Sequence, residues 1–414
     1  MKLFAGLCAV LAACSFQINS NPAASDANVD DAPGSEPLMI DARQDPACAA
    51  LWMYTASNFD PCETTHVIHP SLSLGTGSYT FTPATGVLAL NNVTVSTLSA
   101  SDTSPAVLSL AGLQLAIGTT LRITGTKALI IAVHGGASIN GVISVSAEGM
   151  SSGPGGGTCV AGAGGNALAG PANWTAGGGG GGGGFGSSGG SGGTGDVETG
   201  YAKTPGGTAI AENNDTMIVP LSGGCSGGSG GEEDPSCTSP GTPGPGGGGA
   251  GALQISVRDD LTLGAAARLA ANGGGGTRGI NGLYISGGHV GVGGGGGGSG
   301  GAILVEGRTV SIAASATLCA NGGSGGGGTH NNEGPVTNGV NGGCGPAAAP
   351  GGLGVAASGG NGAFGSTAAD DGENGSRQDD GGGGGGGGVG RIRVRAATGA
   401  RPQGFGSTPP ALVD

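Results

Sequence analysis

The chain has few aromatic and few charged residues. Aromatic residues make up only 3% of its 414 residues, so we do not expect a large conventional hydrophobic core. Charged residues make up 10%, and 14 Lys and Arg stand against 27 Asp and Glu. The resulting net charge of −13 argues against a nucleic-acid-binding protein, because phosphate binding needs concentrated Lys and Arg.

Motifs for nucleotide and calcium binding are also missing. No Gly-x₄-Gly-Lys-Ser/Thr motif occurs, and matches to Gly-x-Gly-x-x-Gly carry no weight in a chain with 101 glycines. The closest approach to a calcium-binding nonapeptide, residues 192–200, places Asp196 one position early and does not repeat. We therefore expect no nucleotide, no cofactor and no metal.

The N-terminal residues predict where the protein is located. The apolar stretch 3–13 is shorter than the roughly 20 residues of a membrane-spanning helix, and it is typical of a secretory signal. Leu11-Ala12-Ala13-Cys14 resembles the lipobox of bacterial lipoproteins, which implies that Cys14 is lipidated and begins the mature chain. Ser15 after the cysteine is typical of outer-membrane lipoproteins. The alternatives are an ordinary signal peptide cut elsewhere and a short buried helix.

The next segment is polar and then gains cysteines. Residues 14–44 are poor in large apolar residues, so we expect a disordered tether. Residues 45–70 predict a small helical cap, closed by a local disulfide between Cys48 and Cys62. His66 and His69 offer zinc binding as an alternative, but their spacing does not match the usual paired-ligand fingers.

Apolar segments recur between the glycine runs. Residues 250–276 and 299–328 align position by position, residues 128–149 form a third copy, and residues 389–396 form a truncated fourth. Their period-2 pattern predicts β-strands. Stacked copies favour an all-β fold, a parallel β-helix or β-solenoid, and a β-sandwich is the alternative.

Long glycine-rich stretches separate these copies. Glycine (101 residues) and proline (22 residues) reach the proportion expected of low-complexity chains. We expect the insertions 150–249, 273–298 and 322–388 to leave one corner of the solenoid. They are either partly ordered in a polyproline-II-like conformation or disordered.

Poly-Gly beside short β segments resembles the Gly-rich bacterial surface and cell-wall proteins, including the PGRS-type proteins. The resemblance covers residues 128–395 and is one of composition. The helical domain that defines the PE-PGRS family is absent. The resemblance implies a surface protein with a β-solenoid body.

Few residues suggest catalysis. Arg258, Asp259 and Asp260 form a mixed cluster whose counterpart, residues 306–309, fits a polar turn better than a catalytic centre. Arg391, Arg393 and Arg395 alternate along the last repeat. We interpret these three as a charged edge that discourages strand addition, with a patch for anionic polysaccharide or lipid headgroups as the alternative.

The remaining cysteines suggest further disulfides. Besides Cys48–Cys62, the candidate pairs are Cys225–Cys237, which closes a short loop, and Cys319–Cys344. Cys319 is alternatively a buried thiol. Seven cysteines follow Cys14, so the connectivity does not follow from the sequence.

We predict a non-enzymatic, lipid-anchored protein of the cell envelope, in the outer membrane and exposed at the surface, with a structural or adhesive role. Its partners are the membrane, through Cys14, and extracellular polysaccharide or other cells. The alternatives are a carbohydrate-active β-helix enzyme, such as a polysaccharide lyase or glycosidase, and a carbohydrate-binding module.

The predicted organisation is a signal peptide (1–13), a tether (14–44), a Cys-bearing helical cap (45–70), the N-terminal part of the solenoid (71–149), a Gly-rich insertion (150–249), solenoid repeats with Gly-rich insertions (250–396) and a C-terminal tail (397–414).

Overall fold

The computed structural model describes residues 51–63, 67–167, 175–196, 202–213, 215–233, 241–281, 291–330, 334–377 and 379–414. The predicted signal peptide and tether lie outside these residues, as does most of the predicted helical turn of the cap. Among the described residues, no helix is long and apolar enough to cross a membrane.

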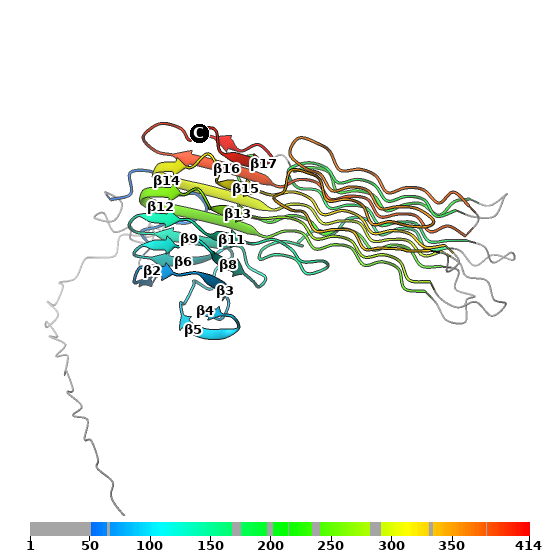
Figure 1. The fold of residues 1–414 in the computed structure, drawn as a ribbon, viewed down its shortest axis with the longest axis horizontal. Helices are drawn as coiled ribbons and strands as arrows, with labels where there is room; N and C mark the ends of the chain where they lie inside the picture. The colour runs from blue at the N-terminus through cyan, green and yellow to red at the C-terminus, as the bar shows by residue number, and fades with distance from the viewer. Residues whose placement is uncertain are drawn as a thin grey trace, which may run out of the picture. The chain divides into compact units, whose positions relative to one another are not determined.

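The described residues form strands and extended segments (Figure 1). The strands are β1 (Ile68–His69), β2 (Leu72–Leu74), β3 (Gly77–Thr82), β4 (Val87–Leu90), β5 (Val93–Thr97), β6 (Ala106–Leu110), β7 (Leu113–Leu115), β8 (Thr119–Ile123), β9 (Leu129–Val133), β10 (Ala137–Ile139), β11 (Val142–Ser144), β12 (Ala252–Leu263), β13 (Arg268–Ala270), β14 (Ala302–Ile312), β15 (Thr317–Cys319), β16 (Arg391–Ala396), β17 (Gly406–Thr408) and β18 (Leu412–Val413).

These strands form two sheets, which we call the β body. The first sheet has ten strands and every pairing in it is parallel. It branches at β12, because the first half of β12 pairs with β9 and its second half pairs with β10. The second sheet has eight strands, in the order β17-β15-β13-β11-β8-β3-β4-β5, and its pairs β3–β4 and β4–β5 are antiparallel.

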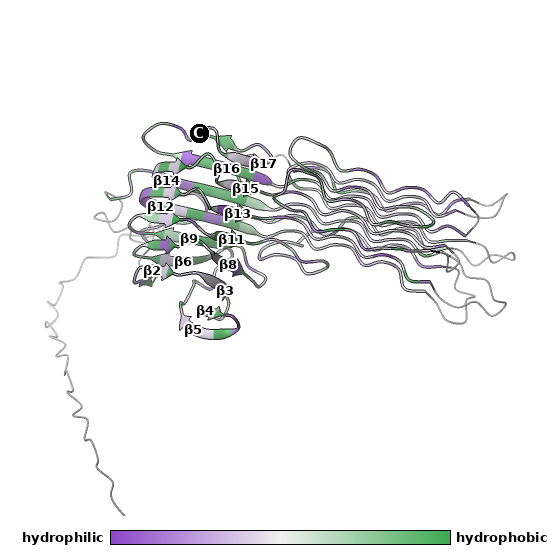
Figure 2. Ribbon diagram, viewed as in Figure 1, coloured by the Kyte–Doolittle hydropathy of each residue, from purple (hydrophilic) through white to green (hydrophobic). Residues whose placement is uncertain are grey.

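The core of the β body is built from Leu, Ile and Val that alternate along the strands (Figure 2). Leu115, Ile139 and Leu263 lie on β7, β10 and β12 and are fully buried. Leu121, Ile143 and Leu269 on the second sheet are also buried, and they belong to the same hydrophobic cluster. Aliphatic side chains of similar size therefore fill the core with little need for aromatic residues.

The copies seen in the sequence lie next to one another in register. Leu261 and Leu263 pair with Val310 and Ile312, which are the positions that the alignment matches. The third copy adds β9, β10 and β11, and the truncated fourth adds β16 beside β14. Equivalent apolar side chains thus stack across neighbouring parallel strands.

The predicted parallel β-helix is nevertheless wrong, and so is the β-sandwich of hairpins. The strands form a branched parallel sheet and a sheet of mixed direction, not one equivalent repeat per coil. The copies differ in how they break into strands, because β12 and β14 are continuous where the third copy divides into β9 and β10. Antiparallel pairing between named strands of the described chain is confined to β3, β4 and β5.

The glycine-rich segments extend from the β body side by side, and we call them the glycine lobe (Figure 1). Their backbone hydrogen bonds repeat every three residues. Within residues 177–183, the amides of Gly177, Gly180 and Gly183 donate to residues 291–297. The amides of Gly178 and Gly181 donate to residues 162–165, and those of Gly179 and Gly182 donate to residues 190–193. Three residues per turn and bonds to other segments only are the properties of a polyproline II helix.

The longest glycine runs lie at the centre of this lobe. Residues 177–184, 293–298 and 381–388 each hydrogen-bond to six neighbouring segments. For residues 293–298 the six neighbours are residues 180–183, 228–231, 244–247, 274–277, 323–326 and 382–385. The lobe is therefore a three-dimensional hydrogen-bonded lattice, which differs from a sheet in having bonds in three directions around each segment.

The close packing of the lattice requires glycine. A Cβ atom added to Gly384 would lie 2.0 Å from the carbonyl oxygen of Gly295, and one added to Gly180 would lie 2.1 Å from that of Gly228. Segments at the periphery instead carry a larger residue at every third position, as Ser226, Ser229 and Glu232 do. Uninterrupted glycine runs occur where all six neighbours are backbone.

We predict that Gly384→Ala destabilises the protein by about 1–3 kcal/mol or more, because the new methyl group must displace backbone on a neighbouring segment. The midpoint of urea unfolding measures this effect. Gly345→Ala is the matched control, since no atom lies within 4 Å of the Cβ that it adds. Equal midpoints for the two variants would contradict the packing described here.

Candidate functional site

The segment 51–63 lies against the outer face of the first sheet and gathers aromatic residues. The ring of Trp52 makes edge-on contacts with Tyr54, at 5.6 Å between ring centroids, and with Phe59, at 6.3 Å. It also contacts the ring of His134, which follows β9, at 5.6 Å. Trp52 is buried by these contacts, so part of the small aromatic content serves to attach this segment.

A buried carboxylate lies beneath the segment. Glu306 on β14 lies between Ser256 on β12 and Arg395 on β16 in the register of the sheet. Its side chain is fully buried, and its Oε2 atom lies 2.9 Å from Arg395 Nη1. Ser256 Oγ donates a hydrogen bond of 2.7 Å to Oε1, and the backbone amide of Ser57 donates one of 2.8 Å.

Further polar contacts complete this cluster. Gln254 Nε2 donates to the carbonyl oxygen of Ser57, and Gln254 Oε1 accepts a hydrogen bond of 2.9 Å from Asn58 Nδ2. The hydroxyl of Tyr54 donates to the carbonyl oxygen of Val257 at 3.0 Å. Burial, together with the nearby charge of Glu306, raises the pKa of Tyr54.

The cluster fastens the segment to the sheet. Both carboxylate oxygens of Glu306 already accept hydrogen bonds, three of them from Ser57 and Ser256. A buried charge with this many donors is well compensated, whereas removal of one partner leaves an unpaired buried charge. We call Gln254, Ser256, Glu306, Arg395 and Ser57 the Glu306 clamp. The clamp has little sequence signal, because Glu306 stands one residue before a glycine, in a pattern typical of a polar turn.

The charged residues of the mixed cluster Arg258, Asp259 and Asp260 form ion pairs on the protein surface. Arg258 Nη2 lies 2.8 Å from Asp259 Oδ2, and Asp260 Oδ1 accepts hydrogen bonds from Arg308 at 3.0 Å and from Thr309 at 2.7 Å. These hydrogen bonds lower the pKa of Asp260, the bond from Thr309 most. Asp260 on β12 and Arg308 on β14, which belongs to the counterpart in the next copy, therefore form an ion pair between the two strands.

The arginines of β16 do not form a free patch or a free edge. Arg393 is 4% exposed and donates to both carboxylate oxygens of Asp414, which lowers the pKa of that carboxyl group. Arg395 joins the Glu306 clamp, and Arg391 donates to the carbonyl oxygen of Asn213. The edge interpretation is wrong, because a further strand, β18, pairs with β16 at Arg393 and Val394.

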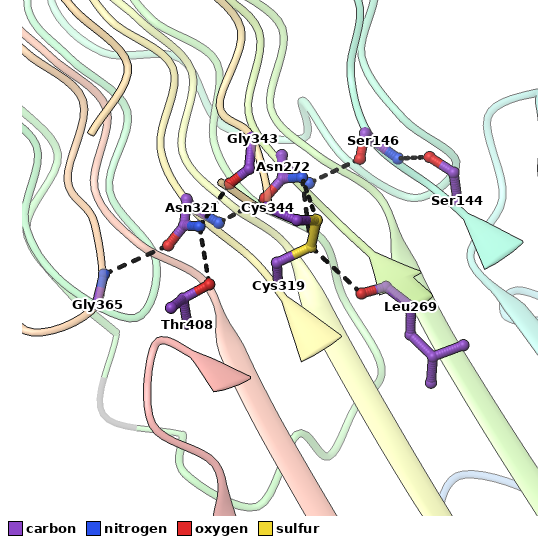
Figure 3. Close-up of a disulfide and its surroundings, with 10 residues drawn as sticks. All are labelled: Ser144, Ser146, Leu269, Asn272, Cys319, Asn321, Gly343, Cys344, Gly365 and Thr408. Atoms are coloured by element: carbon purple, nitrogen blue, oxygen red, sulfur yellow. Dashed lines mark hydrogen bonds between the residues drawn. A yellow bond between two sulfur atoms is a disulfide. The ribbon is translucent and has the colours of Figure 1, made fainter. Parts of the chain in front are cut away.

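Polar side chains mark the junction where strands enter the glycine lobe (Figure 3). Asn272 accepts a hydrogen bond of 2.9 Å from the amide of Asn321, and its own amide donates to Ser146 Oγ at 2.9 Å. Asn321 Nδ2 in turn donates to Gly343 O and Thr408 Oγ1. Asn272 and Asn321 each stand in an Ala-Asn-Gly sequence where a copy passes into its glycine-rich segment. This recurrent sequence has a structural role, since each Asn bonds to the neighbouring segment.

A disulfide between Cys319 and Cys344 lies at the same junction, with a Cα–Cα distance of 5.4 Å. It joins the end of β15 to the glycine lobe. This is one of the pairs considered from the sequence. Asn272 Nδ2 lies 3.5 Å from the sulfur of Cys344, so amide and disulfide pack together.

The pairing of Cys225 with Cys237 is wrong, because Cys225 forms a disulfide with Cys159 at a Cα–Cα distance of 4.7 Å. The amide of Ser226 donates to the carbonyl oxygen of Cys159, so the two segments are lattice neighbours. An extended chain advances about 3.1 Å per residue, so two cysteines a dozen residues apart on one extended segment are far from each other. Cysteines on two neighbouring segments of the lattice are much closer.

The other predicted cysteine and metal residues are only partly described. Cys62 is disulfide-bonded, while Cys14, Cys48 and Cys237 lie outside the described residues. His66 also lies outside them, and His69 Nε2 lies 3.0 Å from the carbonyl oxygen of Ser99. No group of three His, Cys, Asp or Glu able to hold a metal ion occurs within the part of the chain that the structure describes.

Side-chain oxygens replace lattice carbonyls at the edge of the lobe. Asn341 Oδ1 accepts hydrogen bonds from the amides of Gly149 at 3.0 Å and Gly275 at 2.9 Å. Asn338, three residues earlier, accepts from the amide of Arg278 at 3.0 Å. These residues were not predicted from the sequence, although Asn beside glycine at a three-residue spacing is a signal that identifies them.

We predict that Glu306→Ala destabilises the protein by about 3–5 kcal/mol, because it leaves Arg395 without its buried partner. Limited proteolysis within residues 51–63 should become faster as the segment loses its fastening. Asp102→Ala is the matched control, since it removes the exposed pair with Lys127 and should leave both stability and cleavage nearly unchanged. Wild-type cleavage of Glu306→Ala would show that the clamp does not hold the segment.

Comparison of the chain with family models, with curated proteins and with solved structures gives no match.

Proposed function

We propose that this chain is a non-enzymatic protein of the cell envelope with a structural or adhesive role, in which the glycine lobe is a stiff exposed unit. The observation that carries the proposal is the hydrogen-bonded lattice, in which the central runs have six bonded neighbours. Bonds in three directions leave these segments little freedom to bend. The lobe thus differs physically from the flexible Gly/Ser linkers that its composition resembles.

A stiff lattice suits a surface role because it fixes the spacing of outward side chains. Every third residue of a peripheral segment points away from the lattice, as Ser188 and Ser191 do, and three residues advance about 9 Å along the segment. An array with this fixed spacing favours many weak contacts over one deep site. Such multivalent contact is useful for adhesion or coating, because its avidity exceeds each single affinity.

The leader supplies the second part of the proposal. Lipidation of Cys14, as in the lipoproteins whose lipobox it resembles, would attach the chain to a membrane, and Ser15 after the cysteine favours the outer membrane by the same resemblance. Several acyl chains give stable attachment, since each buried CH₂ contributes roughly 0.8 kcal/mol. The polar residues 14–44 would then act as a spacer between the lipid and the β body.

The enzyme alternative has weaker support. Glycosidases need two carboxyl groups at a defined separation, or an acid beside a suitable base. In the mixed cluster on β12, Asp259 is paired with Arg258, and Asp260 is held by Arg308 and Thr309. This pairing favours a non-enzymatic role.

We predict that metabolic labelling with palmitate marks the wild-type protein and is lost in Cys14→Ala, which should also leave the membrane fraction. Cys8→Ala, in the same apolar stretch, is the matched control and should keep both label and location. Protease added to intact cells should cleave the wild-type protein if it faces outward. Labelling that survives in Cys14→Ala would overturn the anchor, and full protection from protease would overturn surface exposure.

A further inference from the structure

An open groove crosses the first sheet on the branch formed by β2, β7, β10 and the second half of β12. It encloses about 410 Å³ and runs across the strands, parallel to the direction in which they stack. Its polar lining is contributed by Ser71, Ser73, Gln114, Ser138 and Asp260. We call this hollow the corner groove.

One side of the groove is a row of polar side chains in register. Ser73 on β2 pairs with Gln114 on β7, which pairs with Ser138 on β10, which pairs with Thr262 on β12. Neighbouring strands lie about 4.8 Å apart, so the row offers a hydrogen-bonding group at that interval. The groove therefore presents the same kind of contact repeatedly along its length.

The floor of the groove is backbone at two glycines. Gly112 and Gly136 occupy equivalent positions between strands, since the amide of Leu113 donates to the carbonyl oxygen of Gly136 and that of Leu72 donates to the carbonyl oxygen of Gly112. A Cβ on Gly112 would lie 2.8 Å from Ser71 Oγ. Side chains at these positions would fill the hollow, so the two glycines keep it open.

The polar groups of the groove are available to a ligand. The hydroxyls of Ser71 and Ser138 make no hydrogen bond within the described residues, and Gln114 makes only a 3.4 Å contact with Ser73. The buried polar groups of the Glu306 clamp are, in contrast, bonded to one another. Hydroxyl and amide groups both donate and accept, which suits a ligand rich in hydroxyls.

The charge of the groove disfavours an anionic ligand. Asp260 is its one ionisable lining residue, and that carboxylate is paired with Arg308. The whole chain carries a net charge of −13, which repels polyanions. Arg308 offsets the charge of Asp260, so a neutral ligand meets little net charge in the groove.

We propose that the corner groove binds a neutral, extended polysaccharide that lies across the strands. This inference rests on the proposed surface role, because it names the partner of that role. Each sugar would exchange hydrogen bonds with the hydroxyl and amide row. Without an aromatic platform each contact is weak, and a long chain gains affinity by meeting several groups of the row at once.

The test is native gel electrophoresis of the full-length protein in detergent, with a polysaccharide cast into the gel. The probes are dextran, a linear neutral β-glucan and a neutral galactomannan, with polygalacturonate as the anionic comparison. The double variant Gln114→Leu/Ser138→Ala removes two groups of the row from the outer face. The control Thr94→Ala/Thr97→Ala changes two exposed hydroxyls on β5.

We expect at least one neutral polysaccharide to retard the wild-type protein, with affinity about tenfold lower for the groove variant and unchanged for the control. Circular dichroism of both variants should match the wild type. Three results would each overturn the groove: no retardation by any of the neutral probes, equal retardation of the groove variant, or retardation by polygalacturonate alone. Because this binding is measured on purified protein, its failure is separate from a failure of the Cys14 labelling.

Discussion

The close approach of backbone to backbone in the glycine lobe is the constraint on which the rest of the structure depends. Each central run reaches six neighbours through amide and carbonyl groups, and the carbonyl oxygens occupy the space that a Cβ would need. Glycine loses more conformational entropy on folding than any other residue, so this lattice needs many bonds to offset that loss. A large fraction of glycine is thus compatible with a folded chain.

The β body supplies what the lattice lacks, namely a hydrophobic core and a defined register. Parallel strands such as β12, β14 and β16 start side by side, so the segments that precede them also start side by side. Asn272, Asn321 and the Cys319–Cys344 disulfide then fix the segments at the junction. The Glu306 clamp fastens residues 51–63 to the same sheet, which would link a tether on its N-terminal side to the body.

The sequence predicted the local structure better than the global one. Strand register followed from the repeated apolar positions, because Leu261 and Val310 must share one face of neighbouring strands. The arrangement of the strands into sheets could not be predicted, because no local sequence signal shows that β12 is continuous where the third copy is divided into β9 and β10. The Glu306 clamp was missed because its partners lie some 50 to 250 residues apart. The lattice was visible only as composition. Its three-residue period was nevertheless present in the sequence, because residues 227–232 are two glycine pairs that are each followed by one larger residue.

Amide hydrogen exchange of the glycine runs tests the central claim most directly. In a lattice, the amides of residues 177–183, 293–298 and 381–388 are buried and bonded, so they should exchange as slowly as those of β12 and β14. Peptides covering the three runs would then keep their protection over the same period as peptides from the strands. Exchange of these runs at the rate of an unstructured glycine linker, with the strands still protected, would contradict the account.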